Sequence, residues 1–179
     1  MILGLFVHMG ITYMTLLKIF TTMDIKHFLK SMAPVQLLGF STSSSGATLP
    51  VTMKRCEKDL GISEEISSFV LPLGATINMD GTALYQGVAA VFIAQAVGMD
   101  LTLANQFTIV ATAVLASIGT AAVPGAGIIM LIIILEAINV PSEGIALILG
   151  VDRILDMIRT ATNVTGDATV ASVMDSLER

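Results

Sequence analysis

The stretch that decides the fold is GVDRILDMIRTATNVTGDATVA, residues 150–171. In a helix, five of its polar side chains fall within roughly 80° of one face, because they recur every three or four residues. They are Asp152, Asp156, Arg159, Asn163 and Asp167. Ionisable groups at membrane depth are costly and mark functional sites, so this stripe predicts a binding site within a membrane helix. The alternative is a soluble amphipathic helix with its polar face in water.

The composition of the whole chain decides between these two. The 179 residues are 54% hydrophobic and only 13% charged, with a mean hydropathy of +0.85. An ordinary soluble domain is about 25% charged, so we predict an all-α integral membrane protein. No basic tract with interleaved aromatic residues is present, and nucleic acid is not expected as a partner. The single cysteine, Cys56, excludes a disulfide framework, and we expect an incidental residue in a charged loop.

Residues 1–22 predict a first transmembrane helix, followed by a polar loop from Asp24 to Lys30. The apolar run has no basic segment before it and no small-residue cleavage site after it, so it is not a signal peptide. Its abrupt start suggests a piece of a longer protein. His8 on this helix and His27 in the loop have no partner at ligand spacing, so we expect packing and solvent contact for them.

Residues 23–65 predict a hairpin of two short helices. Its uncharged part, SMAPVQLLGFSTSSSGATLPVTM at 31–53, is interrupted by serines and by Pro50, which disfavour a helix interior. We expect the serine-rich tip to enter the membrane and return on the same side, covered by protein or lining a cavity. The alternative is a flexible Ser/Gly linker. The charged segment that follows, Lys54 to Glu65, is expected to be a loop.

Residues 66–99 carry one charge, Asp80, and predict a broken transmembrane helix. A continuous helix of this length would be about 50 Å long, well over a bilayer core of about 30 Å. Pro72, Gly74 and the run Asn78-Met79-Asp80-Gly81-Thr82 interrupt it. A break at membrane depth frees carbonyls that can hold a dehydrated cation, so Asp80 is interpreted as a cation ligand rather than a polar interior contact.

Residues 100–142 predict a second re-entrant hairpin with the tip SIGTAAVPGAG at 117–127, and residues 143–179 predict the last transmembrane helix. The arms beside the tip are too short to span a bilayer, and no lysine follows it as a phosphate loop requires. The chain thus contains a hairpin followed by a broken helix, and then a second hairpin followed by a helix with a polar stripe. This order is the pattern of an internal repeat in a secondary transporter.

The basic residues predict the orientation in the membrane. One set of helix ends carries Lys18, Lys26, Lys30, Lys54, Arg55, Lys58 and Arg179, whereas the opposite loops carry only Asp100 and Glu143. By the positive-inside rule, the hairpin 23–65 and the C-terminus are expected on the cytoplasmic side, and the hairpin 100–142 on the outside.

The motifs SSSGATLP, LPLGATINMDGTALYQG, SIGTAAVPGAG and VDRILDMIRTATNVTGD closely resemble those of the dicarboxylate/amino acid:cation symporters, the glutamate–aspartate transporter family. The resemblance covers essentially the whole chain. It implies the transport-domain half of a glutamate-transporter-like fold, with two re-entrant helical hairpins and a broken transmembrane helix. It also implies a C-terminal fragment that begins in the sixth span, and a full-length homotrimer in the plasma membrane, surrounded by lipid.

The resemblance implies a substrate site for an acidic amino acid. Arg159 would pair with the substrate's side-chain carboxylate, Asp156 would receive its α-amine, and Asp152 would steady Arg159. A planar bidentate donor suits a carboxylate, and an anionic oxygen suits an ammonium group. The residues expected around the substrate are Ser43, Ser45, Thr82, Val123, Gly127, Asp156, Arg159, Thr160 and Asn163.

Sodium is implied as the coupling ion, and no other cofactor is expected. One site would combine Asp167 with backbone at Gly74, Asn78 and Asn163; a second would use backbone at Thr76, Ser117, Ile118 and Thr120. Asp80 and Asn78 match part of a third site.

Two features depart from the pattern of the family or could mislead. Many relatives carry a second arginine at the positions of Ser43 or Met157, whereas this chain has Arg153 instead. The sequon that starts at Asn163 matches a glycosylation site, but at membrane depth it is interpreted as coincidental.

The sequence thus predicts a sodium-coupled symporter for glutamate or aspartate that works by alternating access with two hairpin gates. The alternatives are a proton-coupled or C4-dicarboxylate symporter of the same family, a channel-like pore, and a non-transporting remnant. A membrane enzyme is least supported, because no nucleophile–base pair or metal triad is present.

Overall fold

The computed structural model describes all 179 residues and contains helices but no strands, which confirms the all-α prediction. The helices are α1 (Ile2–His8), a π-helical segment η1 (Met9–Tyr13), α2 (Met14–Phe20), α3 (Ile25–Thr42), α4 (Ser45–Lys58), α5 (Glu64–Ile77), α6 (Asp80–Ala96), α7 (Leu103–Ile118), α8 (Ala126–Ala137), a 3₁₀ segment η2 (Ser142–Leu147) and α9 (Leu149–Glu178).

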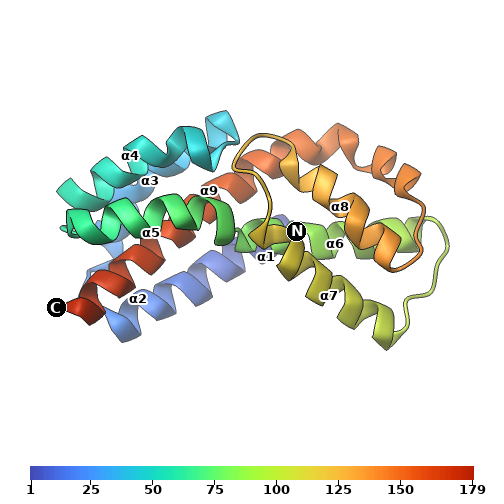
Figure 1. Cartoon of the computed structure of the whole chain (residues 1–179), viewed down its shortest axis with the longest axis horizontal. Helices are drawn as coiled ribbons and strands as arrows, with labels where there is room; N and C mark the ends of the chain where they lie inside the picture. Colours follow the sequence, from blue (N-terminus) through green and yellow to red (C-terminus); the bar gives the residue numbers. More distant parts are fainter.

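The long helix α9 runs through the length of the molecule and joins its two halves (Figure 1). In one half α2, α3, α4 and α5 pack against α9; in the other, α6 contacts α9 while α7 and α8 pack on α6. Each half has its own apolar core. The first core includes Leu17, Phe28, Met32 and Leu71, and the second includes Ile93, Ile109, Leu131 and Ile134.

The chain reverses between α3 and α4 within two residues. Ser43 adopts a left-handed conformation at φ 52°, and Ser44 caps α4 by accepting a hydrogen bond from the Ala47 amide. An N-cap serine satisfies an amide that the first helical turn leaves unpaired. The serine-rich stretch therefore ends one helix and begins the next, which places its polar atoms beside the middle of α9.

Two further non-helical points lie near the middle of α9. Asn78 and Met79 separate α5 from α6 with non-helical backbone angles, and residues 119–125 connect α7 to α8. Gly125 ends that connection at φ 78°, a conformation that glycine adopts without the steric cost of a Cβ. Three helix interruptions thus meet between the two apolar cores.

Two segments expected to be loops are helical in part, and residues 59–63 form the loop between α4 and α5. Asp24 caps α3 through the His27 amide, so α3 begins at Ile25 instead of after Lys30. The charged residues after Met53 continue α4 to Lys58, because the Arg55–Asp59 ion pair at 2.6 Å supports its last turn. Cys56 consequently lies in a helix, fully buried in the first core, and the prediction of a loop residue is wrong.

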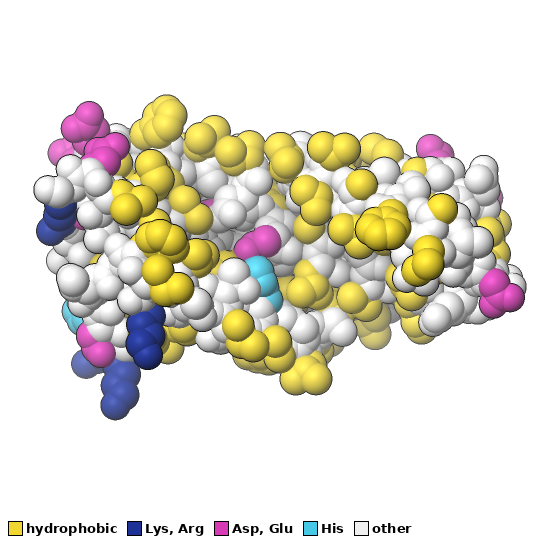
Figure 2. Space-filling model, turned by 90° about the horizontal axis from the view of Figure 1, so that it is seen from below, with side chains coloured by type: hydrophobic (Ala, Val, Ile, Leu, Met, Phe, Trp, Pro, Cys, Tyr) yellow, Lys and Arg dark blue, Asp and Glu magenta, His cyan; other side chains and the backbone are white.

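On the face shown in Figure 2, apolar side chains lie along the length of the molecule, and the visible Lys and Arg side chains gather at one end. The rod formed by Ile2–Phe20 is long and apolar enough to cross a membrane, and 17% of its most apolar window is buried in this structure. Large apolar side chains such as Leu3, Phe69 and Phe107 are at least 70% exposed.

Candidate functional site

The polar stripe of α9 faces the interior. Asp152, Asp156, Arg159, Asn163 and Asp167 are each at most 6% exposed. A soluble amphipathic helix would turn the same side chains to water, so the alternative interpretation of this helix is wrong. The stripe lies between the two apolar cores, where the turn after α3, the break before α6 and the connection after α7 come together.

Arg159 and Asp156 form a buried ion pair at the centre of the site. Arg159 donates from Nη2 to Asp156 Oδ1 at 2.8 Å and from Nε to the same oxygen at 3.2 Å. The other oxygen, Oδ2, accepts from the Gly125 amide at 2.9 Å. Arg159 Nη1 is buried and has no hydrogen-bond partner. A buried charged donor without a partner is costly, so this nitrogen is a site for an acceptor from outside the chain.

Asp152 acts on Arg159 through an aromatic ring. Its Oδ1 accepts from the Tyr85 hydroxyl at 2.7 Å, and the Tyr85 ring lies 4.2 Å from the Arg159 guanidinium carbon. A guanidinium over an aromatic face is attracted by the negative charge of the ring face. The sequence interpretation missed Tyr85, although it follows Thr82 by three residues on one helix and therefore shares its face.

A small cavity lies beside Arg159, and residues from four parts of the chain line it. Its volume is about 20 Å³, enough for one water molecule. The lining includes Ser43, Ser45, Thr82, Val123, Gly127, Asp156, Arg159, Thr160 and Asn163. The structure thus brings together every residue that the sequence assigned to the substrate. It adds Met79, Thr120, Ala121, Ala122 and Ala126.

The two turns that cover the cavity contact each other. Ser44 donates its hydroxyl to the Ala122 carbonyl at 2.6 Å, and the Gly46 amide donates to the same oxygen at 3.2 Å. The Ser43 hydroxyl is buried in the cavity wall without a partner. Arg153 is exposed and does not line the cavity, so it does not supply the second arginine that many relatives carry.

Asn163 ties α9 to the start of α6. Its Nδ2 donates to Thr82 Oγ1 at 3.0 Å, and its Oδ1 accepts from the Gly81 amide at 2.9 Å. This pair of bonds fixes the amide orientation and holds the α5–α6 break against the cavity.

An oxygen-rich corner lies beyond Asn163. Asp167 Oδ1 accepts from Asn78 Nδ2 at 3.0 Å, and a Cβ at Gly74 would lie 2.7 Å from the same oxygen. Only glycine lets the helix approach the carboxylate this closely. The carbonyls of Ala75, Thr76 and Ile77 accept no backbone hydrogen bond because the helix ends at Ile77, whereas the Gly74 carbonyl accepts from the Asn78 amide at 2.8 Å. Carboxylate and carbonyl oxygens are the ligands that hard cations prefer, so these residues fit a sodium ion.

The residues expected to give a second sodium site lie at the ends of α5 and α7, which contact each other. Ser117 is buried, and its hydroxyl donates to the Val114 carbonyl. Thr120 lines the substrate cavity, whereas Ile118 is 46% exposed. Thr76 is exposed, and its hydroxyl bonds the Leu73 carbonyl within its own helix. Backbone oxygens, not these side chains, would have to provide the ligands.

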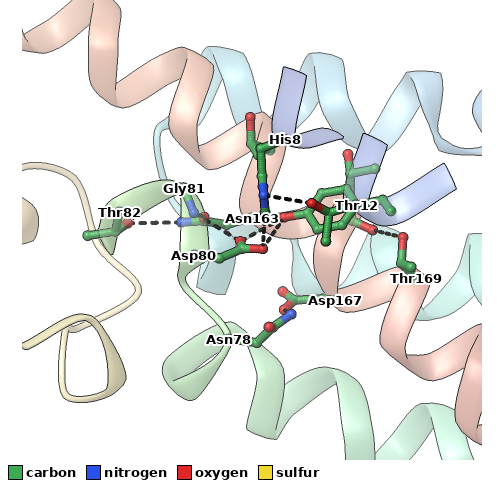
Figure 3. A network of polar contacts seen from close by, with 12 residues as sticks. His8, Thr12, Asn78, Asp80, Gly81, Thr82, Asn163, Asp167 and Thr169 are labelled. Atoms are coloured by element: carbon green, nitrogen blue, oxygen red, sulfur yellow. Dashed lines mark hydrogen bonds and ion pairs between the residues drawn. The ribbon is translucent and has the colours of Figure 1, made fainter. Parts of the chain in front are cut away.

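Asp80 lies at the start of α6 and contacts the first helical rod (Figure 3). His8 Nε2 lies 2.6 Å from Asp80 Oδ2, and the Tyr13 hydroxyl lies 2.7 Å from Oδ1 and 2.6 Å from Oδ2. The expectation that His8 has no specific partner is therefore wrong. His27, by contrast, is exposed on α3 and contacts the Asp59 carbonyl at 2.7 Å.

Comparison with known proteins adds a family and several relatives. The model of a family described as the sodium:dicarboxylate symporter family matches residues 1–177. The chain is 43% identical over 178 residues to excitatory amino acid transporter 4 of Mus musculus. The aligned region covers 99% of this chain and 32% of that protein. It is 44% identical over 178 residues to neutral amino acid transporter A of Bos taurus, with 99% and 34% covered.

A third relative is the putative sodium-dependent excitatory amino acid transporter glt-4 of Caenorhabditis elegans, 44% identical over 176 residues, with 98% of this chain and 35% of that protein covered. The chain thus spans about a third of the length of these relatives.

Proposed function

Because the chain belongs to the sodium:dicarboxylate symporter family, we propose that it is the substrate-binding part of a transporter that takes up acidic amino acids together with sodium. The observation that carries the proposal is the buried, unpaired Nη1 of Arg159, whose side chain lines a small cavity together with Asp156. In a membrane chain with few charges, such a nitrogen calls for an anionic ligand.

The charges of the cavity suit an acidic amino acid. A substrate side-chain carboxylate would accept from Nη1 of Arg159 and from the unpaired Ser43 hydroxyl. The substrate's ammonium group would take Asp156 as its acceptor, in competition with Arg159. A C4-dicarboxylate has no ammonium group and would leave Asp156 to Arg159 alone. Thr160 and Asn163 lie in the same wall and can orient the main-chain carboxylate.

A neutral amino acid is the second candidate, because one relative is a neutral amino acid transporter. Such a substrate has no side-chain carboxylate, so it would leave Nη1 of Arg159 buried and unpaired. An unsatisfied buried donor costs about 1–3 kcal/mol, and more for a charged group. Arg159 therefore favours the acidic substrate.

Sodium is the proposed coupling ion. The Asp167 carboxylate lies beside the end of α5, where carbonyl oxygens have no backbone partner, and Asp80 adds a second carboxylate nearby (Figure 3). Asn163 bonds the Gly81 amide and also lines the substrate cavity, so a change at the ion sites reaches the substrate site through one side chain. Proton coupling would use the same carboxylates without requiring the oxygen-rich break in the helix.

Entry of the substrate requires one of the covering turns to move. A cavity of about 20 Å³ is far too small for an amino acid. We propose that the helix pairs α3–α4 and α7–α8 are re-entrant hairpins from opposite membrane faces, and that α5–α6 is one broken transmembrane helix. Alternating opening of the two hairpins excludes a continuous pore, which distinguishes a symporter from a channel. The basic end would face the cytoplasm, and the full-length protein would be a trimer in the plasma membrane.

The test is uptake of labelled L-aspartate by the full-length protein in proteoliposomes. We expect saturable uptake that requires an inward sodium gradient and is lost when potassium replaces sodium. Arg159→Thr should abolish preference for acidic over neutral substrates, whereas Arg153→Thr, an exposed arginine on the same helix, should change nothing. Uptake of L-aspartate that survives Arg159→Thr with unchanged affinity would refute the assignment of the pocket. Flux that does not saturate would favour a pore, and no flux at all would favour a remnant.

A further inference from the structure

Three hydrogen-bond donors share the Asp80 carboxylate (Figure 3). Oδ1 is contacted by the Gly81 amide at 2.9 Å and by the Tyr13 hydroxyl; Oδ2 is contacted by His8 Nε2 and by the same hydroxyl. The Gly81 amide also bonds Asn163 Oδ1, so His8 and Tyr13 are the donors that serve Asp80 alone. A cation that coordinates the side of the carboxylate that these two residues contact has to displace one of them.

The donors come from an irregular part of the first helical rod. In an α-helix, residues five apart such as His8 and Tyr13 point about 140° away from each other. The π-helical segment Met9–Tyr13 closes its hydrogen bonds from residue i to i+5, and this brings both side chains to one face. Their rings make an edge contact with centroids 4.9 Å apart. The helix irregularity therefore has a specific result, which is the pairing of two donors on one carboxylate.

A hydroxyl on the same rod contacts the other nitrogen of the His8 ring. Thr12 Oγ1 lies 3.1 Å from His8 Nδ1, so the hydroxyl can donate to Nδ1 while Nε2 donates to Asp80. Tyr13 is fixed by packing, because a Cβ at Gly166 would come within 2.6 Å of its hydroxyl. The His8 and Asp80 side chains are 24% and 31% exposed, so the pair can be reached from the surface.

We propose that His8 and Tyr13 form a donor clamp that competes with sodium for the Asp80 carboxylate. The clamp consists of these two side chains, held in register by the π-helical segment. The clamp hydrogen-bonds the carboxylate whenever no sodium ion coordinates it. Sodium binding at Asp80 releases the clamp. This inference rests on the proposed function, because that function supplies the ion. It assigns to His8 and Tyr13 a role in setting sodium affinity.

Removal of a donor separates two possible roles of His8, because competition with sodium and positioning of Asp80 for sodium predict opposite changes in sodium affinity. If the clamp competes, His8→Phe leaves the carboxylate short of one donor and sodium binds more tightly. If His8 merely positions Asp80 for the ion, the same change weakens sodium binding. Loss of one hydrogen bond to the charged carboxylate should lower the apparent sodium dissociation constant about tenfold, which corresponds to about 1.4 kcal/mol.

The experiment follows the thermal stability of the purified, substrate-free full-length protein as sodium replaces choline at constant ionic strength. Ligand binding to the folded state raises stability with concentration according to the dissociation constant, so the titration reports sodium affinity without transport. His8→Phe and Tyr13→Phe should each shift the titration to lower sodium, and His8→Gln, which keeps a donor, should match wild type. His27→Phe, an exposed histidine that does not contact Asp80, is the matched control and should leave the titration unchanged.

Each outcome decides between the possibilities. An unchanged or weaker sodium affinity in both His8→Phe and Tyr13→Phe, with a normal wild-type titration, overturns the clamp and leaves the proposed function intact. If His8→Phe does not fold, Tyr13→Phe alone decides, because its ring keeps the packing against Gly166. A wild-type protein that sodium does not stabilise at any concentration overturns the proposed coupling ion and the clamp together.

Discussion

Gly127 lies so close to Arg159 that a Cβ on it would come within 2.5 Å of the guanidinium nitrogen Nη1. The first turn of α8 can therefore approach the arginine only because residue 127 has no side chain. Nη1 is also the nitrogen of Arg159 that has no hydrogen-bond partner. A side chain at position 127 would therefore occupy the space beside the nitrogen that a substrate would contact.

Gly127→Ala should weaken L-aspartate binding. The new methyl group displaces the guanidinium, and a displacement of about 1 Å can cost a hundredfold in a positioned site. Gly119→Ala is the control, because no atom lies within 4 Å of its Cβ position. Calorimetric titration measures the L-aspartate affinity of both variants. Equal affinity in Gly127→Ala and Gly119→Ala would contradict the prediction.

Gly74→Ala should weaken sodium binding at Asp167. Its Cβ would lie 2.7 Å from Oδ1, so the carboxylate must turn away from the end of α5. The expected result is a higher sodium concentration for half-maximal L-aspartate binding, by roughly tenfold if about 1.4 kcal/mol of coordination is lost. Gly87→Ala, with nothing within 4 Å, should behave as wild type. Identical sodium dependence in Gly74→Ala would show that Asp167 does not hold the ion.

Tyr85→Phe should destabilise the protein by about 1–3 kcal/mol, because the buried Asp152 carboxylate loses its hydrogen bond while the ring stays in place. Thermal unfolding of the substrate-free protein measures the loss. The double variant with Asp152→Leu removes both partners and should be closer to wild type than the single variant. Additive losses would mean that the two side chains are not coupled.

Ser44→Ala should make the covered cavity open more readily. The hydroxyl bonds the Ala122 carbonyl at 2.6 Å, and a hydrogen bond of this kind contributes about 0.5–1.5 kcal/mol, so bound L-aspartate should dissociate up to about tenfold faster. Ser44 also caps α4. Ser63→Ala removes the cap of α5 and no contact between the two turns, which separates a general loss of stability from faster opening. Dissociation rates that are equal in both variants would assign the effect to capping alone.

The parts of the site that repeat at helix spacing could be predicted from the sequence. Asp156, Arg159 and Asn163 share a face because of their spacing alone, and the serines and glycines mark where helices end. The structure places the buried stripe and the covering turns together in one cavity, as the motifs indicated. The membrane arrangement of these elements, and the roles of the lining residues, stay predictions.

The missed contacts depend on long-range packing or on irregular backbone. His8 and Asp80 are 72 residues apart, and their contact depends on a π-helical segment that no residue pattern marks. Asp152 was expected to steady Arg159, but the residue that links them was missed: the Tyr85 ring contacts Arg159, and its hydroxyl bonds Asp152. Charged residues from Lys54 to Lys58 indicated a loop, but their ion pair with Asp59 supports a helix end. Local composition does not contain these relationships.

The two apolar cores share no buried residue, and the polar site lies between them. Hydrophobic burial therefore holds each half together, while cohesion between the halves depends on α9 and on polar contacts at their junction, including the bonds from Ser44 and Gly46 to the Ala122 carbonyl. Substrate and sodium would supply partners for the charges at that junction. Their binding would therefore also strengthen the contact between the two halves. Without them the halves should lose their structure in separate steps on heating, and with both ligands they should melt as one cooperative unit.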